Sequence, residues 1–165
     1  MKNYIVVVWL ACLFTSCQQN NETYLYKHSL FQIEVPKGWL EEESTKSMLF
    51  GANENAKEKI LSANYHVIII EPEKNLYSGV KQNSERNCLR GVCKSTLLKK
   101  RKINNQPCYE VCQDIIINNQ RLIIRQYYFE GKDIVYRLSF VHLKSDGEKT
   151  NKLFNKIVNS FIFKI

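Results

Sequence analysis

The chain has 165 residues and a formal net charge of +8, from 24 Lys and Arg against 16 Asp and Glu. The residues from 28 onward match the common size of one domain, and no Pro-, Gly- or Ser-rich linker divides them. Neither a repeat nor a Gly-rich phosphate loop is present, and no Gly-x-Ser-x-Gly pattern marks a hydrolase. Length and composition therefore favour one domain and exclude a repeat array.

The first residues have the layout of a secretory signal. Lys2 precedes an uncharged apolar run of eleven residues, 4–14, shorter than the roughly 20 that a membrane span needs. The end of the run, Phe14-Thr15-Ser16-Cys17, resembles a bacterial lipobox, although Leu is usual where Phe14 stands. This resemblance implies a signal peptide of residues 1–16 and a lipid on the sulfur of Cys17.

Residues 17–27 form a short polar segment that predicts a flexible tether between lipid and domain. The Asn- and Lys-rich composition is similar to that of Bacteroidetes lipoproteins. Gln18 stands where an Asp would indicate inner-membrane retention, and no dense acidic surface-export cluster follows Cys17. We expect a bacterial envelope protein, anchored by lipid in the outer membrane and facing the periplasm.

The first half of the domain has three strand patterns and one helical pattern. Residues 30–36 alternate apolar and polar side chains, 47–52 form a weaker strand, and 62–72 contain four apolar residues in succession, typical of a central strand. A helix is predicted over 72–90, with Gly91 at its end. Its narrow stripe consists of Leu76, Val80, Ser84 and Cys88.

The second half predicts an antiparallel meander followed by a helix. Its four strand patterns cover 92–102, 107–117, 121–129 and 134–143. The turns between them contain Asn104-Asn105-Gln106, Asn118-Asn119-Gln120 and Gly131-Lys132-Asp133, residue types that tolerate turn geometry. Within 145–163, Ser145 and Glu148 have capping-box spacing. The apolar stripe of this helix is Leu153, Phe154, Ile157, Val158 and Phe161.

Strands first, one helix midway and one at the end predict an α+β domain with an antiparallel sheet. The motifs FQIEVPKGW (31–39), the segment 103–140 and KIVNSF (156–161) carry a resemblance to the PsbP-like family. This family includes photosystem II PsbP, a Ran-binding nuclear import factor and bacterial DcrB-type lipoproteins. The resemblance covers 28–165. It implies an α/β/α sandwich that binds or stabilises other proteins and has no catalytic residue.

Four cysteines remain in the domain: Cys88, Cys93, Cys108 and Cys112. An even set in an oxidising envelope favours disulfides, and the spacings match neither zinc knuckles nor a C-x-x-C redox motif. If 107–117 is a strand, the Cα atoms of Cys108 and Cys112 lie about 13 Å apart, beyond the roughly 7 Å that a disulfide allows. Two complete pairings stay open, Cys88–Cys108 with Cys93–Cys112, or Cys88–Cys112 with Cys93–Cys108. A local Cys88–Cys93 bridge requires the other two thiols to stay reduced.

A possible protein interface is predicted on the Tyr-rich hairpin. Its side chains alternate faces, so Tyr128 and Tyr136 are expected to lie outward, with Arg125 and Arg137 on the other side. Aromatic residues and Arg are favoured at interfaces, but they are also ordinary strand residues. The basic run Lys99–Lys102 is interpreted as a solvated strand edge or the shoulder of a hairpin, because an exported protein meets no nucleic acid. Attraction to anionic lipid or to cell-wall carboxylates is the functional alternative.

No metal or cofactor is expected. His28, His66 and His142 are scattered, and Glu41–Glu43 form a run without the spacing of a calcium loop. No enzyme is expected either, because no nucleophile and base have a recognisable spacing. The sequence predicts a non-catalytic lipoprotein module that binds an envelope protein. The alternative is a lipoprotein that binds a small ligand or a metal ion.

Overall fold

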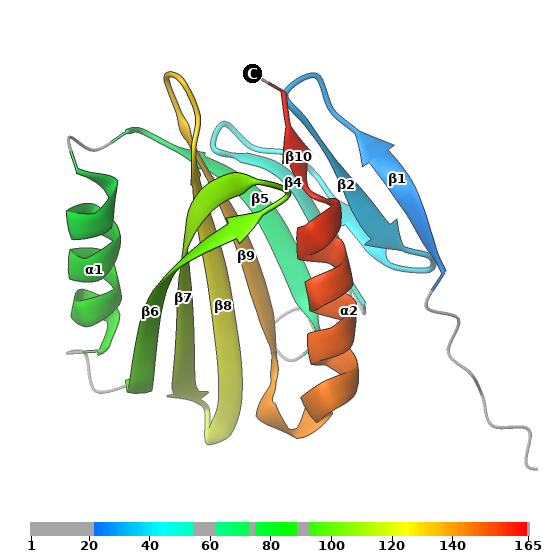
Figure 1. Cartoon of the computed structure of the whole chain (residues 1–165). Helices are drawn as coiled ribbons and strands as arrows, with labels where there is room; N and C mark the ends of the chain where they lie inside the picture. Colours follow the sequence, from blue (N-terminus) through cyan, green and yellow to red (C-terminus); the bar gives the residue numbers. More distant parts are fainter. Residues whose placement is uncertain (1–21, 55–61, 73–74, 89–92, 165) are drawn as a thin grey trace, which may run out of the picture.

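The computed structural model describes residues 22–54, 62–72, 75–88 and 93–164. Within them the chain forms two antiparallel sheets and two α-helices (Figure 1), which confirms the α+β prediction. Neither of these helices is long and apolar enough to cross a bilayer. The strands are β1 (Thr23–Lys27), β2 (Phe31–Pro36), β3 (Leu40–Glu42), β4 (Met48–Asn53), β5 (Asn64–Ile70), β6 (Cys93–Ile103), β7 (Gln106–Ile117), β8 (Gln120–Glu130), β9 (Val135–Leu143) and β10 (Ile162–Phe163). The helices are α1 (Leu76–Asn87) and α2 (Gly147–Ser160).

The large sheet has seven strands in the order β3-β4-β5-β9-β8-β7-β6. Its second half is the predicted meander, in which each strand pairs antiparallel with the next. The two Asn-Asn turns have positive φ at Asn104, Asn105, Asn118 and Asn119. Tight hairpin turns require this conformation, and Asn adopts it more readily than most residues do. The meander was therefore readable from local sequence.

A second sheet, β1-β2-β10, was not predicted. Its strand β1 shows that the tether prediction for 17–27 is wrong over Thr23–Lys27, because these residues pair with β2. Tyr26 explains the difference: its ring centroid lies 4.2 Å from that of Phe50, so β1 contributes to the core. The predicted signal peptide 1–16 and the acceptor Cys17 lie outside the described residues.

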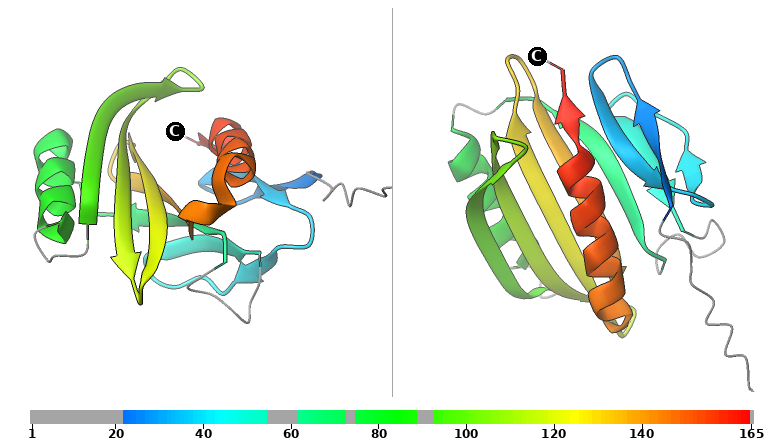
Figure 2. Two further views of the ribbon diagram at one scale, coloured as in Figure 1. Left: turned by 90° about the horizontal axis from the view of Figure 1, so that it is seen from below. Right: turned by 45° about the vertical axis from the view of Figure 1, so that its right-hand side comes forward.

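The two helices lie on opposite faces of the large sheet (Figure 2). We call the face that carries α2 and the small sheet the inner face, and the face that carries α1 the outer face. The inner face holds the main core, in which Phe140 contacts Tyr65, Tyr127 and the α2 residue Phe154. On the outer face, Leu76 and Val80 of α1 pack in a smaller cluster with Val111, Tyr128 and Val135.

Both helix predictions hold, but their ends differ. Helix α1 starts later than predicted, where the Asn75 side chain accepts a hydrogen bond from the Ser78 N–H. For α2 the capping box is wrong: a 3₁₀ turn occupies Lys144–Asp146, and the Ser145 hydroxyl points to Asp146 instead of capping the helix. Beyond α2 the chain adds β10 to β2, so its last described residues pair in the small sheet.

Candidate interaction surface

Polar side chains occupy the inner face at the β6 end of the large sheet. Strand β7 alternates, so that its even-numbered residues Cys108, Glu110, Cys112 and Asp114 lie on this face. Helix α2 packs against β2 and β9, whereas β6 forms the far edge of the sheet. Glu110 and Asp114 are nevertheless almost fully buried here, so each carboxylate requires polar partners within the protein.

Glu110 is the centre of this group, with 7% of its surface exposed. It accepts hydrogen bonds from Nη1 of Arg101 at 2.9 Å and from the Tyr127 hydroxyl at 3.2 Å. Arg101 contacts Oε2 of Glu110, whereas the Tyr127 hydroxyl and Arg125 Nε both lie at Oε1, the latter at 3.6 Å. Burial, together with the charge of Glu110, raises the pKa of Tyr127 to about 12, so the phenol stays a neutral donor. A buried carboxylate is stable only with such partners.

Arg125, one of the four predicted interface residues, connects the sheet to α2. Its guanidinium donates to the amide oxygens of Asn151 and Asn155, at 3.2 Å each. Only 19% of its side chain is exposed. Arg125 therefore connects β8 to α2, and its guanidinium is directed at partners within the protein and not at solvent.

The predicted outward pair of tyrosines is wrong. Tyr128 and Tyr136 are each 3% exposed and lie on opposite faces. Tyr128 pairs across strands with Arg137 and packs under α1, whereas Tyr136 belongs to the inner core and stacks on Phe163. The predicted grouping by face is therefore wrong as well, because Arg137 shares the outer face with Tyr128 and Arg125 shares the inner face with Tyr136. Covering layers lie on both faces, and only the tertiary structure shows that.

The exposed feature at this end is strand β6 itself. Lys99, Lys100, Arg101 and Lys102 are all exposed, and so is Leu97, at 49%. The register places Lys99 and Arg101 on the inner face and Lys100 and Lys102 on the outer face. Of these four cations, only Arg101 has an acidic partner among the described residues, and that partner is Glu110. The basic run is thus a strand edge, as the sequence predicted, and three of its charges are unpaired.

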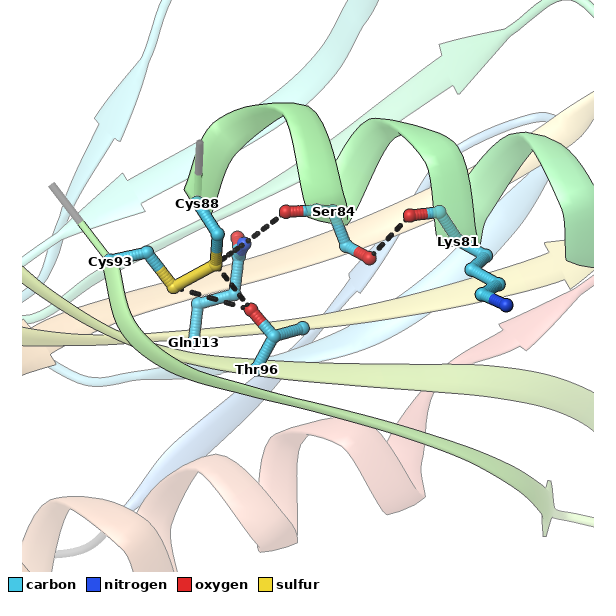
Figure 3. The surroundings of a disulfide bond; sticks show 6 residues. All are labelled: Lys81, Ser84, Cys88, Cys93, Thr96 and Gln113. Carbon is cyan, nitrogen blue, oxygen red and sulfur yellow. Dashed lines mark hydrogen bonds between the residues drawn. A yellow bond between two sulfur atoms is a disulfide. The ribbon is translucent and has the colours of Figure 1, made fainter. Parts of the chain in front are cut away.

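The cysteines pair locally (Figure 3). Cys88, at the end of α1, is bonded to Cys93, at the start of β6, with Cα atoms 4.4 Å apart. Cys108 and Cys112 are free thiols. Both complete pairings from the sequence are wrong, and the local alternative holds. The predicted pairings fail because the cysteines lie on opposite faces of the large sheet. Cys108 and Cys112 lie on the inner face, whereas α1, which carries Cys88 at its end, packs on the outer face.

Polar contacts surround the disulfide. The Thr96 hydroxyl lies 2.6 Å from the sulfur of Cys88 and 3.2 Å from that of Cys93. Gln113, on the outer face of β7, donates to the Ser84 carbonyl at 3.2 Å. The end of α1 is thereby attached to β6 covalently and to β7 by a hydrogen bond (Figure 3).

The free thiol of Cys108 lacks the environment of a reactive cysteine. Cys108 is 3% exposed, and burial raises its pKa to about 11, which keeps the sulfur protonated. A nucleophilic or metal-binding cysteine needs the opposite shift. Cys112 is half-buried and pairs across strands with Leu97 and Arg125.

The histidines and the acidic run play separate roles. His142 is 2% exposed against the Phe154 ring, and burial lowers its pKa. His66 lies on the outer face, 3.3 Å from a Glu42 oxygen, and Glu41 accepts a hydrogen bond from the Tyr24 hydroxyl. His66 and His142 therefore do not meet. No group of three metal-ligating side chains occurs in the part of the chain that the structure describes.

A cavity of about 130 Å³ lies under α1. Ile70, Leu76 and Val80 form part of its wall, and Arg86 and Tyr128 contribute polar atoms. The Tyr128 hydroxyl already donates to Gln126 at 2.9 Å. The cavity is large enough for a small organic group, and α1 forms one side of it.

No family model and no curated protein matches the chain. Solved structures do match in fold. Cyanobacterial PsbP (CyanoP) of Synechocystis sp. PCC 6803 aligns with a TM-score of 0.62 and 13% identity, over 87% of this chain and 94% of that chain. LpqN of Mycobacterium tuberculosis, described as involved in cell envelope biogenesis, aligns with 0.60 and 10%, over 87% and 91%. A Pseudomonas aeruginosa protein of unknown function, described as a putative regulator, aligns with 0.57 and 11%, over 87% and 98%. The predicted PsbP-like fold is confirmed, and such low identities show the fold alone.

Proposed function

We propose that this protein is a lipid-anchored accessory protein of the bacterial cell envelope whose PsbP-like domain binds another protein and catalyses no reaction. The observation that carries the binding role is strand β6, which exposes four cations and Leu97 along one edge. Three of the four cations, Lys99, Lys100 and Lys102, have no acidic partner among the described residues, and an exposed array of positive charge attracts an acidic partner and speeds its association.

The anchor rests on the sequence, because Cys17 follows an apolar segment and a lipobox-like ending. Strand β1 begins at Thr23, six positions after Cys17, so the fully extended connection spans about 20 Å at most. The domain would therefore stay near the membrane surface. An outer-membrane location facing the periplasm is part of this proposal, and the description of LpqN as an envelope biogenesis protein is compatible with it.

Cys17→Ala tests the anchor. We expect the wild-type protein to fractionate with membranes and to carry the added mass of acyl chains, and the variant to lose both. Equal membrane association and equal mass for the two proteins would disprove lipidation. A Cys112→Ala variant serves as the matched control, because Cys112 is a free thiol within the folded domain.

Photo-crosslinking in living cells tests the binding role. A photoreactive residue at Leu97 is expected to trap a partner protein, whereas the same residue at Leu25 is expected to trap none or different ones. The two leucines are comparably exposed, at 49% and 45%, but Leu25 lies in the small sheet. Identical products from both positions would show that β6 has no special role.

The cavity under α1 supports a second candidate, the binding of a small ligand. Its wall combines apolar side chains with Arg86, as small-molecule sites do. Native mass spectrometry of protein purified from its own membranes tests this candidate. A bound molecule that is lost from a Val80→Trp variant, in which the added ring fills the cavity, would favour this function over the first.

A further inference from the structure

Strand β6 forms one edge of the large sheet, and its outer side is open. Its eleven residues pair on one side with β7, and none of its backbone groups is bonded to another element among the described residues. Helix α1 packs on the outer face, where it buries side chains of β7, β8 and β9 and also contacts Leu98 of β6. The disulfide joins its end to Cys93, so the part of the edge away from α1 is the basic stretch that follows Leu98. Every second residue of an edge strand points its N–H and C=O outward.

The opposite edge of the large sheet, strand β3, is much shorter than β6. Strand β3 has three residues, Leu40–Glu42, too few for a stable pairing with another chain. At about 3.3 Å per residue, β6 is roughly 36 Å long, and the five residues that follow Leu98 alone span roughly 16 Å, about the length of a common strand. Of the two edges, only β6 offers a template of this length.

The charges of β6 select the strand that can pair with it. Lys99 and Arg101 face inward and Lys100 and Lys102 outward, so an added strand meets cations on both of its faces. Lysines on an edge repel neutral and basic strands and thereby prevent aggregation. The same charges favour a strand with Asp or Glu on each face, because cross-strand pairs of opposite charge are stabilising.

Leu97 adds an apolar anchor at one end of this basic stretch. It is 49% exposed and lies on the inner face beside the half-buried Cys112. An apolar side chain of the added strand can cover it there. Main-chain hydrogen bonds supply affinity in such complexes, and alternate side chains supply specificity.

We infer that β6 binds an extended acidic segment of a partner protein as an eighth strand of the large sheet. The inference rests on the proposed protein-binding function and names its partner chemistry: carboxylates on both faces of the segment and an apolar residue opposite Leu97.

The test uses the full chain with Cys17→Ser and a fluorescent ten-residue peptide that alternates Glu with Val and Thr. We expect saturable binding by fluorescence anisotropy and a loss of at least tenfold in affinity with Lys99→Glu/Lys100→Glu. The matched control is Lys46→Glu/Lys132→Glu, which reverses two exposed charges outside β6 and is expected to leave affinity within about twofold. Circular dichroism confirms that both variants fold. Equal affinities for the two variants would overturn the inference.

Two N-methylated peptides separate strand addition from charge attraction alone. One is methylated at its odd-numbered amides and the other at its even-numbered amides, with identical charge. Strand addition predicts that one of the two methylated peptides loses binding and the other retains it, because only alternate amides of the peptide face the edge of the sheet. Equal binding of the two peptides would overturn strand addition.

The failures of the two proposals are distinguishable. If Leu97 crosslinks a protein in cells but the peptide does not bind, protein binding stands and strand addition is wrong. If the peptide binds but no protein is trapped, strand addition stands and the proposed partner function is wrong. A third outcome is self-association of the chain that is abolished by Glu41→Lys/Glu42→Lys and is not competed by the peptide. This outcome would assign the edge to a second copy of the chain and overturn the acidic-partner inference.

Discussion

On the inner face of the large sheet, α2 and the small sheet bury a continuous core of twenty residues, counted over the described part of the chain. On the outer face, α1 shares a cluster of five. Buried apolar area is the main source of stability, so the inner face holds the fold together and α1 adds little of its own. The Cys88–Cys93 disulfide lies at the end of α1, the helix with the smaller cluster, and attaches it to β6. We therefore expect α1 to open at a lower free energy than α2.

The largest expected effect is on the inner face. Phe140→Ala removes a fully buried ring that contacts Tyr65, Tyr127 and Phe154. We expect the free energy of unfolding to fall by about 3 to 5 kcal/mol, from lost burial and the cavity left behind. Urea denaturation followed by tryptophan fluorescence measures it. A loss below about 1 kcal/mol would contradict the assignment of the core to this face.

The disulfide comes second. Replacing both partners, as Cys88→Ser/Cys93→Ser, removes a link between positions five apart, for which the chain-entropy model gives about 2 kcal/mol. We expect amide exchange to accelerate in α1 and to stay unchanged in α2. A reducing agent should reproduce the effect in the wild-type protein and do nothing to the double variant. Equal acceleration of amide exchange in α1 and α2 would show that the outer face is no less stable than the inner face.

Val80→Ala tests the outer packing directly. It removes two methyl groups from a side chain that is 3% exposed, which predicts a loss of about 1 to 2 kcal/mol at roughly 0.8 kcal/mol for each buried carbon. Measured in the same buffer as Phe140→Ala, it should be clearly the smaller effect. If the two variants lose equal stability, the outer cluster supports the fold as much as the inner one.

The smallest effect concerns charge. Asp114 accepts two hydrogen bonds from Arg121 and one from Lys144, and these cations hold its pKa well below its usual range. The folded protein therefore keeps this carboxylate ionised, while the unfolded chain protonates it near pH 4. The stabilisation is complete above that pH and is lost as the pH falls toward the folded pKa. We expect Asp114→Asn to lose less stability than the wild type between pH 4 and pH 2 in thermal denaturation. Parallel curves for the two proteins would contradict this role.

Local patterns predicted the meander and both helices, because they depend on neighbouring residues. Asn-Asn pairs specify hairpin turns, alternation specifies strands, and the stripe of Leu76, Val80 and Ser84 does face the sheet. The predictions that failed depended on distant partners. Strand β1 looked like a polar tether because its pairing with β2 and its contact with Phe50 are tertiary.

For the candidate surface, too, the sequence predicted one part correctly and another part wrongly. The basic run Lys99–Lys102 was correctly interpreted as a strand edge from its composition, whereas Tyr128 and Tyr136 were placed outward although both are buried. Composition reports charge directly, but whether a strand face is covered depends on elements far away in the chain. The candidate interaction surface is therefore the exposed edge strand β6 and not the two buried tyrosines.

By itself, the sequence determined the α+β class, the order of the meander strands, the basic edge and the impossibility of a Cys108–Cys112 bond, because these follow from backbone periodicity and composition. Only the tertiary structure decided that α1 and α2 lie on opposite faces of the large sheet. That placement separates Cys88 and Cys93 from the other two thiols, leaves the local disulfide as the bond that forms, and leaves the outer side of β6 open.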